Sequence, residues 1–408
     1  MYTSDNGTTI LHDTQCTDSY GAVFVINTPV YDYTGIAHVA EHLIFRTSPS
    51  FPSPHNLFAT LALSPLSINA STQGDITMVF AQMPVTAGSP SRFLEAIAFL
   101  YAGIINQQYT DNEIKQEKDG VIYQELRFYE RQRPYTHAIE KWIDNPDLYS
   151  NSEVATLCAG GFSRPLMALC ANDILAYKQR WYASHTITLI TNFPNQRQIQ
   201  QTLAACADAV PAKGRKSYQK HEIPALTQQQ KPLFGYAKFS EVINRLIRLY
   251  SELNLPIYTR ASPWTPPASI APLFHDTKIS TPPCDILGAD PVRATLAEKW
   301  TNQPHHGLRN LPPLPRYLGG QWSAFRNQEL TVNTTNDWYL ALSYHAVDSQ
   351  MLSNLIMDSR FWLPRTAGEC YTQGIARHDE QIILFGVNDK QVEHRHHYAD
   401  WILQQLSG

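Results

Sequence analysis

The chain has 408 residues, of which 43% are hydrophobic and 17% are charged, and its net charge is −4. This length and balance indicate a globular protein with room for two domains with full cores. Because the sequence contains no block of like charge, neither nucleic acid nor an anionic membrane surface is expected as its main partner.

The first half of the chain alternates short apolar strands with long amphipathic helices. In chain order, the pattern predicts a strand at 23–26, helices at 33–45 and 56–63, strands at 68–72 and 76–80, helices at 91–105 and 111–133, a strand at 186–190 and a helix at 195–209. This alternation favours a fold of α+β layers.

The second half is separated from the first by a polar stretch rich in lysine and glutamine. This stretch predicts a linker at 211–232 between an N-terminal domain at 1–210 and a C-terminal domain at 233–408. Within the second domain, the pattern predicts a helix at 239–253, a proline-rich irregular segment at 256–315, a strand at 338–344, a helix at 349–362, a strand at 381–387 and a helix at 390–406.

The helix predicted at 33–45 carries the most informative pattern of the chain, H-x-x-E-H. His38 and His42 are four residues apart, so they lie on one face of a helix, where two imidazoles can hold one zinc ion. Glu41 projects to the same side and is placed to act as a general base that takes a proton from water. This spacing is typical of one class of zinc peptidases. The alternative interpretation is an ordinary helix face with a salt bridge.

Two histidines do not complete a catalytic zinc site, because such a site needs three protein ligands and a fourth position for water. We predict that Glu125, on the charged helix at 111–133, is the third ligand of one zinc ion per chain. Three other glutamates of this helix compete with it: Glu113, Glu117 and Glu130. Glu117 is interpreted as a carboxylate that orients a ligand imidazole, or as a surface charge.

Three segments around these residues follow longer patterns. Residues 35–48 read G-x-x-H-x-x-E-H-x-x-F-x-x-S, residues 67–72 contain Asn-Ala-x-Thr, and residues 120–125 end a Gly-Val segment with glutamate. They resemble the zinc helix, the L-N-A-x-T strand and the G-V-V-x-N-E segment of the pitrilysin/insulinase family of zinc peptidases. The last of these is found in the presequence-protease branch, where its glutamate is the third ligand. The spacing from His42 to Glu125 is slightly longer than is usual in the family.

A stretch near the C-terminus, residues 365–371, is similar to R-x-x-G-x-x-Y of the same branch. The resemblance implies that Arg365 and Tyr371 reach the substrate backbone and the oxyanion. Without the resemblance, Arg365 would be a cation at a helix end and Tyr371 a half-buried aromatic. Asn69 and Ala70 are predicted to bind substrate, because an extended peptide can add to their strand if it is a sheet edge.

The family also implies an architecture. It builds a closed chamber from two halves, each with two pitrilysin-like domains in which helices pack on an antiparallel-rich sheet, and this chain has the length of one half. In members of this length, the arginine and tyrosine act on the zinc site of the partner. We therefore expect a homodimer with two composite sites that cleaves small unfolded peptides. The alternatives are a catalytic subunit of a heterodimeric processing peptidase and a scaffold homologue without catalysis.

The remaining signals are weaker. The histidines at 394–397 would spread over several faces of a helix, and those at 305–306 lie in the proline-rich segment, so both groups are interpreted as solvated surface. The six cysteines are far apart, which predicts reduced thiols and no zinc site built on cysteine. No signal peptide or membrane-spanning run is recognised, so a cytoplasmic location is expected.

Overall fold

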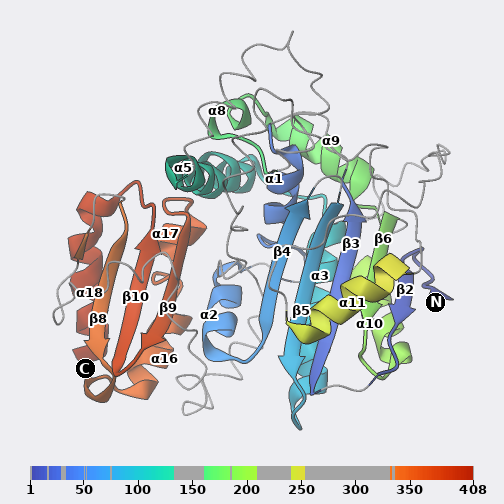
Figure 1. Ribbon diagram of the computed structural model, residues 1–408. Coiled ribbons are helices and arrows are strands. Elements are labelled where there is room, and N and C mark those ends of the chain that lie inside the picture. The colour runs from blue at the N-terminus through green and yellow to red at the C-terminus, as the bar shows by residue number, and fades with distance from the viewer. Residues whose placement is uncertain are drawn as a thin grey trace, which may run out of the picture.

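Two β-sheets lie side by side in the computed structural model of the chain, and helices pack against both (Figure 1). The structure describes residues 2–15, 18–28, 34–49, 51, 53–73, 76–132, 160–183, 186–208, 240–252, 331–332 and 336–407. The predicted linker at 211–232 and the proline-rich segment at 256–315 lie outside these residues. The predicted α+β class, with helices on antiparallel-rich sheets, is confirmed.

The larger sheet belongs to the N-terminal part of the chain and has the strand order β1-β2-β6-β3-β5-β4. Its strands are β1 (Tyr2–Thr3), β2 (Thr9–His12), β3 (Ser19–Asn27), β4 (Ser67–Gln73), β5 (Ile76–Pro84) and β6 (Ile187–Thr191). All neighbours are antiparallel except β2 and β6. In the described residues β4 pairs only with β5, so the strand that carries Asn69 and Ala70 is a sheet edge, as predicted.

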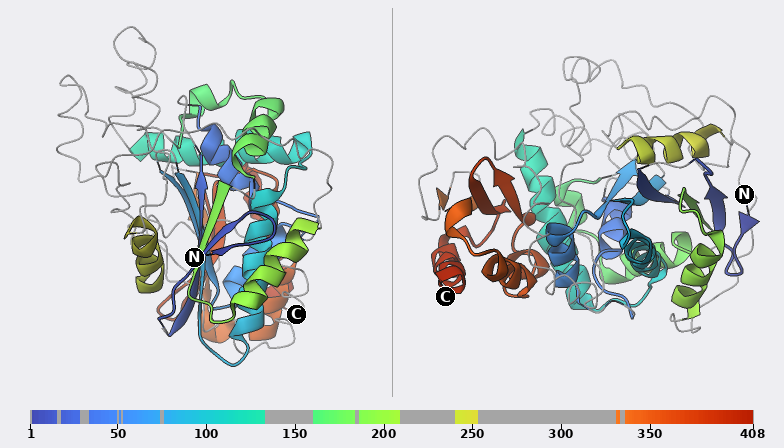
Figure 2. Two further views of the ribbon diagram at one scale, coloured as in Figure 1. Left: turned by 90° about the vertical axis from the view of Figure 1, so that its right-hand side faces the viewer. Right: turned by 90° about the horizontal axis from the view of Figure 1, so that it is seen from below.

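The central strand β3 is buried on both faces, because helices cover each face of this sheet (Figure 2, left). Alternate side chains point to opposite faces. Phe24 packs in one cluster with α3 (Ser89–Ile105) and α10 (Gln196–Asp208), whereas Val25 packs against α11 (Glu241–Glu252). The helix α11 falls within the predicted second domain, yet it covers the sheet of the first.

The helices that carry the candidate site meet near the upper end of this sheet in Figure 1. They are α1 (Ile36–Leu43), α4 (Asp111–Lys115), the π-helix η1 (Gln116–Ile122), α5 (Tyr123–Gln132), α8 (Ser163–Leu166) and α9 (Ala171–Trp181). The helix α2 (His55–Leu63) lies lower, between the two sheets (Figure 1). The sequence predicts one continuous helix at 111–133, whereas the structure inserts seven residues of π-helix into it. None of the helices that the structure describes combines the length and the apolar character required to span a bilayer.

The smaller sheet and its helices form what we call the C-terminal unit, residues 336–407 with the short strand at 331–332. Its strand order is β7-β8-β10-β9, and every pair is antiparallel. The elements are β7 (Thr331–Val332), β8 (Trp338–Ser343), α16 (Ser349–Met357), α17 (Leu363–Thr366), β9 (Thr372–His378), β10 (Gln381–Val387) and α18 (Arg395–Ser407). One face of the sheet packs against α16 and α18, and the other packs against η1 and α5 through Val121 and Phe128.

Two sequence predictions in the C-terminal unit differ from the structure. The helix predicted at 349–362 ends at Met357, because Asp358 has an extended backbone with ψ 126° and pairs with Arg360. The strand β9 has no counterpart among the predictions. Its sequence contains glycine and only one aliphatic residue larger than alanine, Ile375, so it lacks the alternation that identifies a strand.

Candidate metal centre

The backbone at the start of α1 brings a distant segment against His38. Gly35 has a φ of 76°, which favours glycine, and a Cβ atom there would lie 2.6 Å from the carbonyl oxygen of Gly160. This close approach lets His38 Nδ1 donate a hydrogen bond of 2.9 Å to the same oxygen. Because a carbonyl can only accept, this hydrogen bond places a proton on Nδ1 of His38, and in the neutral imidazole the lone pair is then on Nε2.

Both imidazoles present Nε2 to one carboxylate oxygen. His42 Nδ1 lies 3.1 Å from Glu117 Oε2, so the Nδ1 atoms of both histidines have protein partners. Glu125 Oε2 lies 3.6 Å from His38 Nε2 and 3.4 Å from His42 Nε2. The structure therefore gathers the three predicted ligands, two from α1 and one from α5.

These separations can be compared with the geometry of zinc. Tetrahedral zinc with bonds of about 2.0–2.2 Å places neighbouring ligand atoms about 3.3–3.6 Å apart. The two distances to Glu125 match that value, and two histidines with one glutamate form a known catalytic zinc set. A second triplet of possible ligand atoms, from His38, Glu41 and His42, lies within 4.8 Å. We favour Glu125 over Glu41 as the third ligand, because Glu41 accepts a hydrogen bond from Thr72.

The π-helix explains how Glu117 and Glu125 reach the same imidazole. In a regular α-helix, residues eight apart point about 80° away from each other, whereas residues seven apart nearly coincide. A π-helix has more residues in each turn, so η1 turns Glu125 back toward the face of Glu117. The two glutamates then bind opposite nitrogens of His42. This arrangement also accommodates the long spacing from His42 to Glu125.

Glu117 is the most enclosed charge of the site, with 1% of its surface exposed. Its Oε1 atom lies 3.3 Å from Nη1 of Arg46 and 3.3 Å from Nη1 of Arg365. Burial alone would raise its pKa, but Arg365, His42 and Arg46 together lower the pKa of Glu117 to about 2. Burial opposes charge on His42 as well, yet hydrogen bonds with Glu117 and Glu125 raise the pKa of His42 to about 9 in the metal-free protein.

Glu41, the predicted general base, lies beside the edge strand. Burial raises its pKa, while His38, His42 and the Thr72 hydroxyl act in the opposite direction. Thr72 belongs to β4 and donates its hydrogen bond to Glu41 Oε2. Its oxygen is also 3.0 Å from the hydroxyl of Thr77 on β5. The base is thus tied to the strand that carries the half-buried Asn69 and Ala70.

The competing glutamates of the same helix have other partners. Glu113 accepts hydrogen bonds from Thr110 at the start of α4 and from Thr47. Glu130 accepts hydrogen bonds of 2.8 Å from the backbone and hydroxyl of Ser163. Neither of these carboxylates contacts the histidines of α1 in the described contacts.

Arg365 and Tyr371 are both buried, with 4% and 3% of their surfaces exposed. Arg365 contacts Glu117 of the same chain, and Tyr371 packs against Phe128, with 5.8 Å between the ring centroids. Their predicted contacts with substrate stay a prediction. In this arrangement Arg365 lies behind His42, on the side of Glu117.

Several residues of the site were not singled out in the sequence. Gly160 contacts the ligand His38, Thr72 contacts the base Glu41, and Arg46 contacts Glu117, the partner of His42. Thr72 is the threonine of the Asn-Ala-x-Thr pattern at 67–72, so the sequence could have identified it as a residue of the site. The partners of Gly160 and Arg46 are distant in sequence, and no local pattern points to them.

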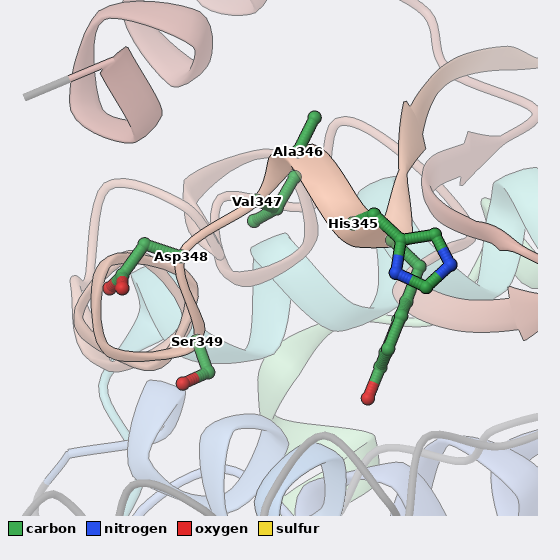
Figure 3. Close-up of a pocket in the computed structure, with 6 residues that line it drawn as sticks. His345, Ala346, Val347, Asp348 and Ser349 are labelled. Atoms are coloured by element: carbon green, nitrogen blue, oxygen red, sulfur yellow. The ribbon is translucent and has the colours of Figure 1, made fainter.

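A shallow surface pocket of about 450 Å³ lies elsewhere, in the C-terminal unit, and is lined by residues 344–349 (Figure 3). It is at the far end of β8 from α1 (Figure 1). His345 and Asp348 point away from each other in Figure 3, and Asp348 accepts hydrogen bonds from the first turn of α16. The pocket therefore gathers no set of convergent polar groups.

Residues 30–148, which include the two histidines and the three glutamates of the site, match the family model of insulinase, peptidase family M16. This match to part of the chain bears out its resemblance to the pitrilysin/insulinase family of peptidases. No curated protein matches the chain.

Three solved structures show distant similarity. They are a putative M16-like peptidase from Alicyclobacillus acidocaldarius (17% identity, TM-score 0.40, 54% of this chain and 50% of that chain), a protease from Helicobacter pylori (16%, 0.39, 55% and 52%) and the periplasmic protease PqqL from Escherichia coli (19%, 0.41, 55% and 25%). The chain matches about half of the length of the first two and a quarter of the third. At this distance the three structures do not bear on its activity.

Proposed function

We propose that the chain is a zinc-dependent endopeptidase that cleaves small unfolded peptides. The observation that carries this proposal is the position of Glu125 Oε2, which lies 3.6 Å from His38 Nε2 and 3.4 Å from His42 Nε2, as neighbouring ligands of tetrahedral zinc would. A ligand atom of Glu41 lies within 4.8 Å of both histidines. His38, His42 and Glu125 would hold the ion. When bound, zinc acts as a Lewis acid and lowers the pKa of water.

The side chains around this centre supply the other steps of a hydrolysis. Glu41 accepts a proton from the attacking water and returns it to the leaving amine. Thr72 holds the Glu41 carboxylate in place through its hydroxyl. An extended peptide would add to the sheet at β4, its edge strand in the described residues, on which Asn69 and Ala70 lie. Because such pairing uses the peptide backbone, it tolerates many side chains.

The assembly is part of the same proposal. Two copies of the chain would enclose a chamber that admits unfolded peptides and excludes folded proteins, with a heterodimer as the alternative. Gel filtration with mass measurement separates the two, because a homodimer forms from the purified chain alone.

Metal analysis of the purified chain, combined with cleavage of an unstructured peptide, tests the function. We expect one zinc per chain and cleavage that a chelator abolishes. Glu41→Gln should keep the zinc and lose about 10²–10⁴-fold in rate, since it removes only the general base. Glu393→Gln, an exposed glutamate of the C-terminal unit, is the matched control and should behave as the wild type. Cleavage that persists in chelator, or at full rate in Glu41→Gln, would refute the proposal. Zinc binding without any cleavage would indicate a scaffold.

A further inference from the structure

The two oxygens of Glu117 face different partners. Oε2 contacts the ring nitrogen of His42 that points away from Glu125, and Oε1 contacts the guanidinium groups of Arg46 and Arg365. A carboxylate that binds the distal nitrogen of a ligand imidazole fixes the tautomer and the orientation of its ring. Whatever fixes Glu117 therefore also fixes His42.

Arg365 is buried, like the glutamate that it contacts, and it packs on an aromatic ring. It has 4% of its surface exposed, and its guanidinium carbon lies 5.4 Å from the centre of the Phe58 ring. Arg46 completes the pair, because its Nη1 also donates a hydrogen bond of 2.9 Å to the backbone oxygen of Thr366, next to Arg365. Two arginines thus balance the charge of Glu117, Arg46 after α1 and Arg365 in α17, and the hydrogen bond from Arg46 to Thr366 joins these two segments.

This arrangement joins the C-terminal unit to the helix that carries both glutamates. A Cβ atom on Gly120 would lie 2.5 Å from the carbonyl oxygen of Gly368, so only glycine lets η1 and the turn after α17 approach so closely. A few residues away, Asn388 donates hydrogen bonds to the backbone and side chain of Gln124. These contacts place Arg365 beside Glu117, although the two residues are 248 positions apart.

We propose that Arg365 is a positioning residue of the metal centre in its own chain. It acts through Glu117 on His42 and does not bind the substrate in the site of a partner. The inference rests on the proposed function for the identity of the metal. In place of a composite site made from two chains, it gives each chain a metal site that its own C-terminal unit completes.

Zinc affinity of the full-length protein, measured by competition with a chromophoric chelator, is the first test. Arg365→Met should weaken zinc binding about 10–100-fold, the usual effect of losing a partner of a ligand. Arg365→Lys should restore part of this loss, because it keeps the charge but not the planar group. Arg360→Met is the matched control, because Arg360 is an exposed arginine of the same unit that contacts Asp358 and the Trp401 ring, away from Glu117. Unchanged zinc affinity in Arg365→Met would overturn the proposal.

Coupling to Glu117 distinguishes positioning from a general loss of structure. If Arg365 acts through Glu117, the effects of Arg365→Met and Glu117→Gln on zinc affinity should not add. Simple addition of the two effects would contradict the proposal. If Arg365→Met fails to fold, the same cycle can be measured with Arg365→Lys.

Peptide cleavage gives an independent readout. With saturating zinc, Arg365→Met should recover kcat with an unchanged KM, whereas a substrate-binding arginine would alter KM at every zinc concentration. At limiting zinc, where Arg365→Met has lost activity, mixing it with Glu41→Gln should restore none of it, and restoration would overturn the proposal in favour of composite sites. A wild type that binds zinc without cleaving would refute the peptidase function alone, since the affinity measurements would still test Arg365.

Discussion

The hydroxyl of Thr72 offers a direct test of how the base is held. Thr72→Val removes the hydrogen bond to Glu41 but keeps a β-branched side chain that suits β4. A hydrogen bond to a charged group contributes about 1.5–3 kcal/mol. One pKa unit corresponds to about 1.4 kcal/mol, so the loss should raise the pKa of Glu41 by about 1–2 units.

The sign of this change follows from the charge of the carboxylate. The hydrogen bond stabilises ionised Glu41, so its loss raises the pKa in the same direction as burial does. The base works only when deprotonated. The acid limb of kcat/KM against pH should therefore move about 1–2 units to higher pH, and activity at the acid end should be lost first.

The assay is a pH–rate profile of the zinc-loaded protein with an unstructured peptide. Thr72→Ser retains a hydroxyl and should return the acid limb close to its original position. Zinc affinity should stay constant in both variants, because Thr72 contacts none of the three predicted ligands in the described contacts. An acid limb that does not move in Thr72→Val would refute the reasoning.

Three further predictions concern metal binding and stability. Since the pKa of His42 is about 9 without metal, zinc binding at pH 7.5 should release about one proton, and calorimetry in buffers of different ionisation enthalpy that detects none would contradict this. Gly120→Ala should lower the free energy of unfolding by about 1–3 kcal/mol through its clash with Gly368, measured by urea denaturation, and an unchanged midpoint would refute the contact. Lys178→Met should cost about 3 kcal/mol in the same assay, because it removes the ammonium that donates to three carbonyls at the end of α3, of which Gly103 alone keeps a described side-chain donor, Tyr109, and a neutral effect would count against this role of Lys178.

Four of the six strands of the N-terminal sheet were predictable because local patterns determine them, whereas β1 and β2 have no counterpart among the predictions. The apolar run at 23–26 and the paired strands at 68–72 and 76–80 all lie inside strands of the structure. The site on α1 was equally visible, because a spacing of four residues fixes two side chains on one helical face. In these segments, the residues that determine the structure lie close together in the sequence.

Other features depend on contacts between distant segments, so no local pattern reveals them. The sequence of α11 predicts a helix with one apolar face, but it does not tell which sheet that face covers. Arg365 resembles a substrate-binding residue in sequence, and only the packing of the C-terminal unit shows its contact with Glu117. The strand β9 is formed by pairing with β10 and has little pattern of its own.

The π-helix η1 has a consequence for recognising related sites in other sequences. Glu117 and Glu125 are one residue farther apart than two α-helical turns would require, yet they meet the same imidazole. A search that fixes the number of residues between two such carboxylates would pass over this chain. What makes a carboxylate a partner of the histidine is its angular position around the helix. A π-helical turn contains more residues than an α-helical turn, so one added residue can leave that angle unchanged.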